Sequence, residues 1–201
     1  MDLLHGLDLL SPFVFALVGA RVAADKGLDY GGIAFIAAIA SVSGGTLRNV
    51  FLGLKPIWIT DSSIIASVIL AVVITLVFRR VTRIGKTLLV MDTFGLAIAT
   101  ISGTQLAFEQ NIDWYSAILL GVITAVTGGL LRDVLCQLEP VLLHRETIGT
   151  SSLMGAITFV ALTELSVANN ISAIAGGMVV VLTRVLSIRF DLHLPKFKNA
   201  K

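Results

Sequence analysis

Long apolar stretches separated by short polar breaks follow one another along the whole chain. An apolar stretch of about 17 to 25 residues can cross the hydrocarbon core of a bilayer as an α-helix. Seven such stretches are predicted as membrane-spanning helices: 9–25, 31–54, 62–79, 87–108, 114–136, 147–165 and 171–188. The pattern therefore predicts an all-α membrane protein with seven transmembrane helices, folded as a single transmembrane domain over residues 1–201.

The composition agrees with a membrane protein and excludes several other classes. Of the 201 residues, 56% are hydrophobic and 14% are charged, and the mean hydropathy is +0.93, whereas a soluble domain has about a quarter of its residues charged. A net charge of +2 is too small for a nucleic-acid-binding surface. The single Cys136 excludes an internal disulfide, and three scattered histidines suggest no metal site. Because no catalytic motif occurs, we expect neither enzymatic activity nor a cofactor.

The sequence repeats itself after 84 residues. Residues 8–60 align with residues 92–144 without a gap, and 13 of the 53 aligned positions are identical. The identities include a glycine doublet, an arginine, aspartates and a proline, which chance similarity between apolar helices would not readily align. Each copy holds three predicted helices, at about 8–80 and 87–165, so the second copy crosses the membrane in the opposite direction. This predicts a 3+3 inverted-topology repeat plus one C-terminal helix at about 171–188.

Glycine doublets lie at equivalent places inside the second and fifth predicted helices. Each glycine inside a helix costs up to about 1 kcal/mol relative to alanine, so the doublets suggest either a kink or a close approach of another helix. A kink would turn backbone carbonyls toward water or an ion, whereas small residues also serve ordinary helix packing. Both interpretations stay open. The candidate pore residues are Ser43, Gly44, Gly45, Thr46, Thr127, Gly128 and Gly129, with Thr100 and Thr104, and a cation site is considered near Gly44 and Gly128.

Two arginines and two aspartates form a second candidate group. Arg48 and Arg132 follow the doublets by three residues, still inside apolar surroundings. The inverted topology places Asp8 level with Arg48 at one face of the membrane and Asp92 level with Arg132 at the other. Because an intramembrane charge is costly, we expect these groups to pair. The pairs then either brace the helix ends or form a gate or a substrate site.

The distribution of Lys and Arg predicts the orientation, because basic loops resist translocation. With the N-terminus outside, the cytoplasmic side collects the basic residues between 79 and 86 and between 189 and 201, and only Lys55 lies outside. We therefore predict an N-terminus outside and a C-terminus in the cytoplasm. The cluster at 79–86 could also attract anionic lipid head groups, although a topology signal is the simpler interpretation.

The motif Ser-x-Ser-Gly-Gly-Thr-Leu-Arg-Asn at 41–49, with its echo Thr-Gly-Gly-Leu-Leu-Arg-Asp at 127–133, resembles the prokaryotic branch of the trimeric intracellular cation (TRIC) channels. The resemblance extends to about residue 190. It implies a plasma-membrane homotrimer in which each protomer holds a pore for monovalent cations, chiefly potassium. It also implies that the first, second, fourth and fifth helices line this pore, with kinks at both glycine doublets.

A second functional class stays open beside the channel. Bacterial sequences of this kind have also been labelled glycine transporters, so a secondary transporter of a small zwitterion such as glycine is the alternative. Animal members carry a Lys-Glu-Val motif in the fourth helix, and its absence here argues against phosphoinositide regulation, although lipid is still an expected partner. For the trimer we expect an association surface of small residues on the third and sixth helices. These residues are Ser63, Ala66 and Ser67, and Ser151, Ser152, Gly155 and Ala156.

Overall fold

The protein is all-helical throughout the part that the computed structural model describes, residues 3–78, 84–140 and 148–190. Its helices are α1 (Leu3–Asp25), α2 (Tyr30–Phe51), α3 (Ile57–Thr60), α4 (Ser62–Val77), α5 (Ile84–Glu109), α6 (Trp114–Leu135), α8 (Ile148–Glu164) and α9 (Asn169–Arg189). Each of the seven predicted segments overlaps one of the longer helices, which confirms the fold class. The single-turn α3 was not predicted, because four residues are too few to show a periodic pattern.

Helix length separates two groups among the seven long helices. Five of them, α1, α2, α5, α6 and α9, contain spans that are long and apolar enough to cross a membrane. The other two, α4 and α8, are shorter apolar helices of 16 and 17 residues. They occupy equivalent places, since each is the third predicted membrane helix of its repeat. The chain is therefore an integral membrane protein in which the two repeats have the same sequence of long and short helices.

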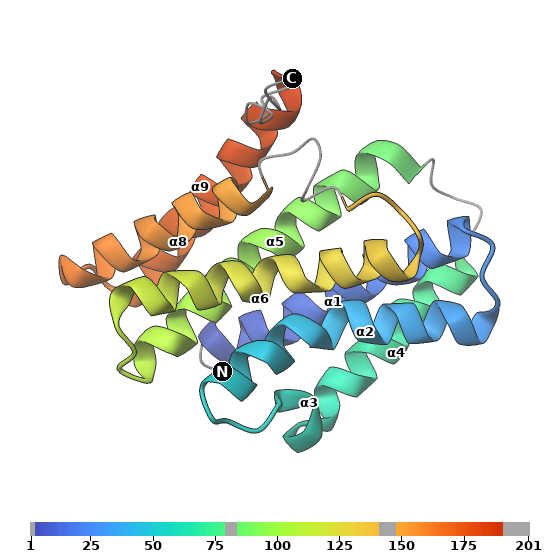
Figure 1. Ribbon diagram of the computed structural model, residues 1–201, viewed down its shortest axis with the longest axis horizontal. Helices are drawn as coiled ribbons and strands as arrows, with labels where there is room; N and C mark the ends of the chain where they lie inside the picture. Colours follow the sequence, from blue (N-terminus) through green and yellow to red (C-terminus); the bar gives the residue numbers. More distant parts are fainter. Residues whose placement is uncertain (1–2, 79–83, 141–147, 191–201) are drawn as a thin grey trace, which may run out of the picture.

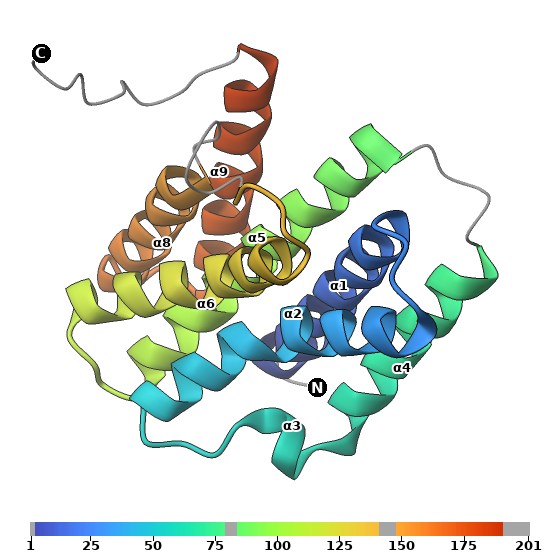
Figure 2. The ribbon, with the colours of Figure 1, turned by 45° about the vertical axis from the view of Figure 1, so that its right-hand side comes forward.

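The two repeats pack against each other through their first and second helices. Figure 1 shows α2 and α6 side by side across the middle of the molecule, and both pairs α2 with α6 and α1 with α5 are in contact. In each repeat the first helix also packs against the third, α1 against α4 and α5 against α8. Figure 2 shows α4 on one side of this centre and α8 with α9 on the other. The additional helix α9 packs against α5 and α8.

The second helices of the two repeats begin and end at equivalent residues. Asp29 precedes α2, where its carboxylate accepts a hydrogen bond from the Gly32 N–H at 2.7 Å, and Asp113 stands at the same place before α6. After the helices, Gly53 and Gln137 both have positive φ, 68° and 52°. A glycine tolerates this conformation without strain, whereas a glutamine rarely adopts it. The backbone of the repeat is thus retained even where the favourable residue is not.

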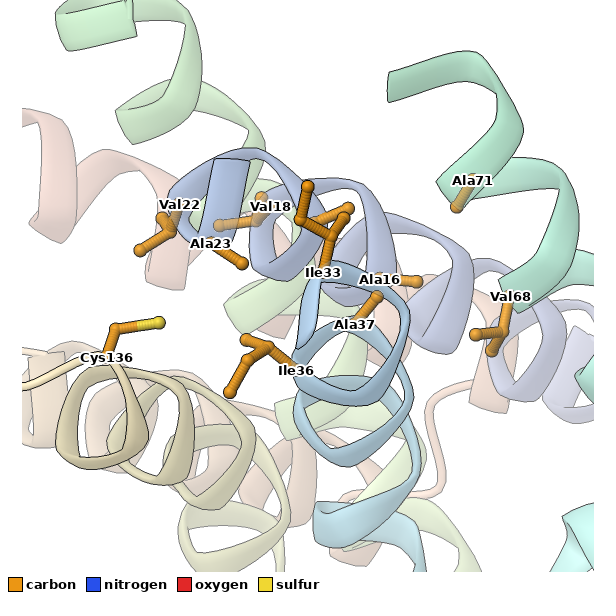
Figure 3. Close-up of a cluster of buried hydrophobic side chains, with 11 residues drawn as sticks. Ala16, Val18, Val22, Ala23, Ile33, Ile36, Ala37, Val68, Ala71 and Cys136 are labelled. Carbon is orange, nitrogen blue, oxygen red and sulfur yellow. The ribbon is translucent and has the colours of Figure 1, made fainter. Parts of the chain in front are cut away.

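Small and β-branched residues form the core between α1, α2 and α4 (Figure 3). Alanines at the contact let the helices approach closely, as is common in membranes. Cys136, directly after α6, joins the edge of this cluster.

The expected association surface is wrong for the sixth predicted helix. Ser151, Ser152, Gly155 and Ala156 of α8 are buried inside the protomer. A Cβ on Gly155 would collide with Val180 of α9, which shows how tightly the two helices pack. The sequence pattern could not separate these contacts from contacts between subunits, because small residues serve both. Of the residues expected at this surface on α4, Ser63 and Ala66 are exposed and Ser67 is partly buried.

Candidate functional site

The first glycine of each doublet lies where α2 crosses α6. A Cβ on Gly44 would collide with the carbonyl oxygen of Thr124, and a Cβ on Gly128 would collide with the carbonyl oxygen of Ala40. The two contacts are equivalent under the 84-residue offset. Both helices continue through their doublets. Of the two interpretations left open, close approach of another helix therefore accounts for Gly44 and Gly128.

The second glycine of each doublet has a different environment. A Cβ on Gly45 would meet no atom within 4 Å, and a Cβ on Gly129 would have Nη2 of Arg132, at 3.8 Å, as its nearest neighbour. Each of these glycines borders a cavity. The missing side chains therefore leave open space inside the protein, whereas at the first glycines the missing side chains allow contact.

Two cavities in the protein are related by the repeat. The repeat-one cavity is bordered by Asp8, Gly45, Arg48 and Ile64, among others, and leaves about 40 Å³ open to the centres of water molecules. The repeat-two cavity leaves about 20 Å³ and is bordered by the equivalent Asp92, Gly129, Arg132 and Ile148. A single water needs roughly 10 to 15 Å³ on this measure. Both cavities can therefore hold water, and the one in the first repeat can hold more.

Arg48 lies almost fully buried at the repeat-one cavity, with its side chain 1% exposed. Its Nη1 donates to Oδ1 of Asp8 at 3.0 Å and to Oγ of Ser102 at 2.7 Å. The Ser102 hydroxyl in turn donates to Asp8, and Nε of Arg48 donates to Oδ1 of Asn49 at 2.9 Å. Ser102 belongs to α5, so this network ties the two repeats together.

Arg132 makes the corresponding contacts at the repeat-two cavity. Its Nη1 lies 2.9 Å from Oδ1 of Asp92, and its Nε donates to Oδ1 of Asp133 at 2.8 Å. The second carboxyl oxygen of Asp92 lies 3.8 Å from Nη2 of Arg184 in α9. The structure thus brings each aspartate to the arginine that the offset assigned to it, and it adds Asp133 and Arg184 to the second group.

Sequence reasoning missed these two added residues as members of the site, although a signal was present. Asp133 aligns with the neutral Asn49, so the second repeat carries one more carboxylate inside the membrane. Arg184 lies inside the mostly apolar α9, whose other cation is Arg189 at the end of the helix, and the Arg184 side chain is 1% exposed. Because buried charges need partners, the additional carboxylate and the additional guanidinium could have been assigned to one cluster.

The hydroxyl residues proposed for the pore have separate locations. Thr46 borders the repeat-one cavity, where it donates to the Val42 carbonyl at 2.7 Å and accepts from Nε1 of Trp58 at 3.0 Å. Thr100 and Thr104 are fully buried and border neither of the two cavities. Thr100 lies 2.8 Å from the Ser152 hydroxyl of α8, and Thr104 packs on Gly121 of α6.

The other two, Ser43 and Thr127, are equivalent under the offset and likewise border neither cavity. Thr127 donates to the Ile123 carbonyl at 2.6 Å. The buried Oγ of Ser43 makes no hydrogen bond within the described part of the chain.

Hydroxyl oxygens are concentrated in the repeat-one cavity. Ser11, Ser41, Thr46 and Ser102 all border it, and Ser41 donates its hydroxyl proton to the Ala38 carbonyl at 2.8 Å. A hydroxyl that donates to its own helix keeps lone pairs for another partner. Oxygen ligands of this type suit a hard monovalent cation. The cavity can therefore accept either water or a small cation.

A third cavity, between α1, α5 and α9, is larger and differs in character. It leaves about 350 Å³ open and is bordered by Leu7, Phe94, Ile98, Ile101, Met178 and other apolar side chains. No charged or hydroxyl side chain among the described residues borders it. An ion entering this cavity would lose its hydration without gaining ligands, so the two smaller cavities form the candidate site.

Comparison with known sequences supports the repeat and identifies relatives. The family model described as "Glycine transporter" matches the chain twice, at residues 5–80 and 89–164, and these matches are again offset by 84 residues. The chain is 31% identical over 199 residues to the UPF0126 inner membrane protein YadS of Escherichia coli (strain K12), covering 97% of this chain and 96% of that protein. It is also 31% identical over 203 residues to the UPF0126 membrane protein of Vibrio cholerae, covering 100% and 85%.

Solved structures share the same arrangement of helices. The TRIC trimeric intracellular cation channel orthologue from Rhodobacter sphaeroides superimposes with a TM-score of 0.90 at 31% identity, covering 96% of this chain and 100% of that one. A second structure, from a study of conductance through TRIC cation channels, gives a TM-score of 0.86 at 29% identity and covers both chains fully. The twofold family match, the relatives and these structures agree, and the chain belongs to the prokaryotic TRIC family, whose sequence model is described as glycine transporter.

Proposed function

We propose that the protein is a channel for monovalent cations, chiefly potassium, with one conduction path inside each protomer. The observation that carries this proposal is the pair of symmetry-related cavities. Along α5 the repeat-one cavity reaches Ala99 and Ser102, and the repeat-two cavity reaches Asp92 and Leu96. Ten residues of helix, from Asp92 to Ser102, correspond to about 15 Å. The cavities therefore follow each other along the helix, as two halves of one path would.

The charges beside the path favour a channel. An unpaired arginine would repel a cation, but Arg48 and Arg132 are each in direct contact with an aspartate, at 3.0 Å and 2.9 Å. The pairs therefore contribute little net charge, and the hydroxyl oxygens of the repeat-one cavity are left as weak ligands. Conduction requires sites that bind weakly enough to release the ion. A potassium site near Gly44 and Gly128 would fall in this cavity, since both glycines border it.

The proposal includes the assembly and the orientation of the protein. The related Rhodobacter sphaeroides protein is described as trimeric, and we assign a homotrimer to this chain, with lipid around it. The Lys and Arg distribution supports an N-terminus outside the inner membrane and a C-terminus in the cytoplasm. Light scattering of the detergent complex tests the first assignment, and labelling of a terminal tag in intact cells tests the second.

Transport of glycine is the second candidate, because the family model carries that description. A zwitterion needs one acidic and one basic group that are free to bind it. In both cavities these groups bind each other, so a substrate would have to displace an existing ion pair. This cost favours the channel over the transporter.

Planar bilayer recording separates the two candidates. The purified protein in a potassium chloride gradient should give discrete openings whose reversal potential has the sign expected for cation flow. Proteoliposomes loaded for glycine exchange serve as the matched assay. Glycine accumulation without discrete currents would reject the channel, because carriers turn over far too slowly to produce resolved openings.

A further inference from the structure

Phe15 of α1 lies between the two cavities. Among the described residues that border either the repeat-one or the repeat-two cavity, Phe15 alone borders both. Its side chain is buried, with 5% exposed. Every other bordering residue belongs to one cavity. The two water-accessible spaces therefore approach each other at this one side chain.

The phenyl ring fills the space between α5 and α6. A Cβ on Gly95 of α5 would lie 3.5 Å from Cζ of Phe15, and a Cβ on Gly128 of α6 would lie 3.6 Å from Cδ1. These are ordinary contact distances, so the ring reaches the surface of both helices. Gly128 is also the residue at which α6 crosses α2. The ring thus lies at the depth where α6 crosses α2.

The surroundings of the ring are apolar. Phe15 belongs to a buried cluster that includes Leu96, Ala99 and Ala125, and these three side chains also border the cavities. None of the four carries a group that could replace water around an ion. A narrow apolar segment in a pore loses its water and then blocks ions. The apolar side chains around Phe15 would therefore block the passage of ions.

The barrier is present once, although the scaffold is duplicated. Under the 84-residue offset the equivalent of Phe15 is Ala99, which borders the repeat-one cavity. The position that could carry a second aromatic ring thus carries a single methyl group. Removing one side chain should consequently remove the main obstruction.

We propose that Phe15 is the hydrophobic barrier of the closed path, and that ions pass when its ring leaves the space between α5 and α6. This inference rests on the proposed function, since it assumes that the two cavities are parts of one path. It adds the residue that keeps them apart.

The test compares Phe15→Ala with Phe13→Ala. Phe13 is a matched control because it lies on the same helix, is partly buried in the cluster between α1, α2 and α4, and borders neither cavity. In planar bilayers Phe15→Ala should increase the time spent open or the conductance several-fold, and Phe15→Leu should give a smaller increase. Phe13→Ala should conduct like the original protein. If Phe15→Ala does not assemble, Phe15→Leu, which removes less volume, supplies the comparison.

A second measurement distinguishes failure of the barrier from failure of the channel. Osmotic water permeability of proteoliposomes does not depend on which solute the protein carries, and it should rise in Phe15→Ala above Phe13→Ala. A rise in water permeability without any cation current in any variant would reject the channel and keep the barrier. Cation currents that are the same in the original protein, Phe15→Ala and Phe13→Ala, with equal water permeability, would overturn the role of Phe15.

Discussion

The two cavities have the same frame and different linings. In each, an aspartate from the first helix meets an arginine near the end of the second, and a glycine leaves the space open. The hydroxyl side chains, however, border only the repeat-one cavity among the described residues. Ser11, Ser41 and Thr46 of the repeat-one cavity align with Gly95, Ala125 and Leu130. The positions that stayed equal set the backbone and the ion pair, and the positions that diverged set what the cavity can bind.

The ion-pair networks also differ in charge. Among the residues that the structure describes, Arg48 has one carboxylate partner, Asp8, and its other hydrogen bonds go to neutral groups. Arg132 contacts two carboxylates, Asp92 and Asp133. The second network also reaches Arg184 of α9, a helix outside the repeat. Loss of one aspartate should therefore destabilise the two networks by different amounts, although they occupy equivalent places.

The largest effect is expected from removal of an aspartate. Asp8→Asn leaves Arg48 buried without a carboxylate, and breaking a buried pair in this way costs about 3 to 5 kcal/mol, less where water reaches the charge. Asp92→Asn should cost less, because Arg132 keeps Asp133 at 2.8 Å. Thermal unfolding of the two variants in detergent measures the difference.

The direct pairing can be checked in the same assay by exchange of the charges. Asp8→Arg combined with Arg48→Asp should recover part of the stability lost in Asp8→Asn. Equal unfolding temperatures for Asp8→Asn and Asp92→Asn would contradict the difference drawn between the networks. An exchange variant no more stable than either single variant would contradict the pairing itself.

Substitution of the first glycines should have the next largest effect and should affect both repeats alike. In Gly44→Ala and Gly128→Ala the new methyl group would collide with a carbonyl oxygen of the other repeat. Overpacking of this kind costs about 1 to 3 kcal/mol, sometimes more. The yield of assembled protein and its unfolding temperature should fall in both variants. A loss in one variant alone would show that the crossing of α2 and α6 is less symmetric than the contacts indicate.

Substitution of the second glycine of each doublet should raise the stability of the protein, whereas substitution of the first lowers it. Gly45→Ala and Gly129→Ala meet no close backbone, so each should stabilise its helix by about 0.5 to 1 kcal/mol while the methyl group narrows a cavity and lowers the conductance. Gly177→Ala is the control, because Gly177 lies inside α9, has a similarly open environment and borders only the apolar cavity. It should stabilise the protein and leave conduction unchanged. Unaltered conductance in both Gly45→Ala and Gly129→Ala would show that the two cavities are not parts of the conduction path.

The smallest effect is expected from exchange of the hydroxyl pattern. Thr46→Val removes an oxygen from the repeat-one cavity and one hydrogen bond from Trp58, at a cost of about 1 kcal/mol. The conductance should decrease. Leu130→Thr places a hydroxyl at the equivalent position of the repeat-two cavity and should raise it. Paired single-channel recordings under one ionic condition measure both changes, and a decrease in both would mean that the linings do not limit conduction.

The helices and the ion-pair partners could be predicted because the sequence carries them twice. Each membrane segment is a long apolar run, and the offset of 84 residues, together with three helices per copy, assigned Asp8 to Arg48 and Asp92 to Arg132. These assignments need only the order of the helices. The end of α4 at Val77 and the start of α5 at Ile84 deviate from the prediction by a few residues, because hydropathy changes gradually at helix ends.

The roles of the individual glycines and hydroxyls could not be predicted in the same way. Gly44 and Gly45 are neighbours in sequence but differ by about 100° around the helix, so one meets α6 and the other meets open space. Which one does so depends on how α2 and α6 cross. The placement of Thr100 and Thr104 away from the two cavities depends on the rotation of α5 in the same way. The pattern of residues along the sequence does not contain the angle at which two helices cross or the rotation of one helix against another.

The contact between α2 and α6 has a consequence for the origin of the protein. Gly44 meets Thr124 while Gly128 meets Ala40, so each partner of the contact presents the same surface to the other, as in an isologous dimer. An ancestral protein of three helices, inserted into the membrane in both directions, could already form this contact with a second copy of itself. Fusion of two such copies in one gene would free the two halves from identity. Only after that step could one half acquire Phe15 where the other has Ala99, and only then could a seventh helix bring Arg184 to one end alone.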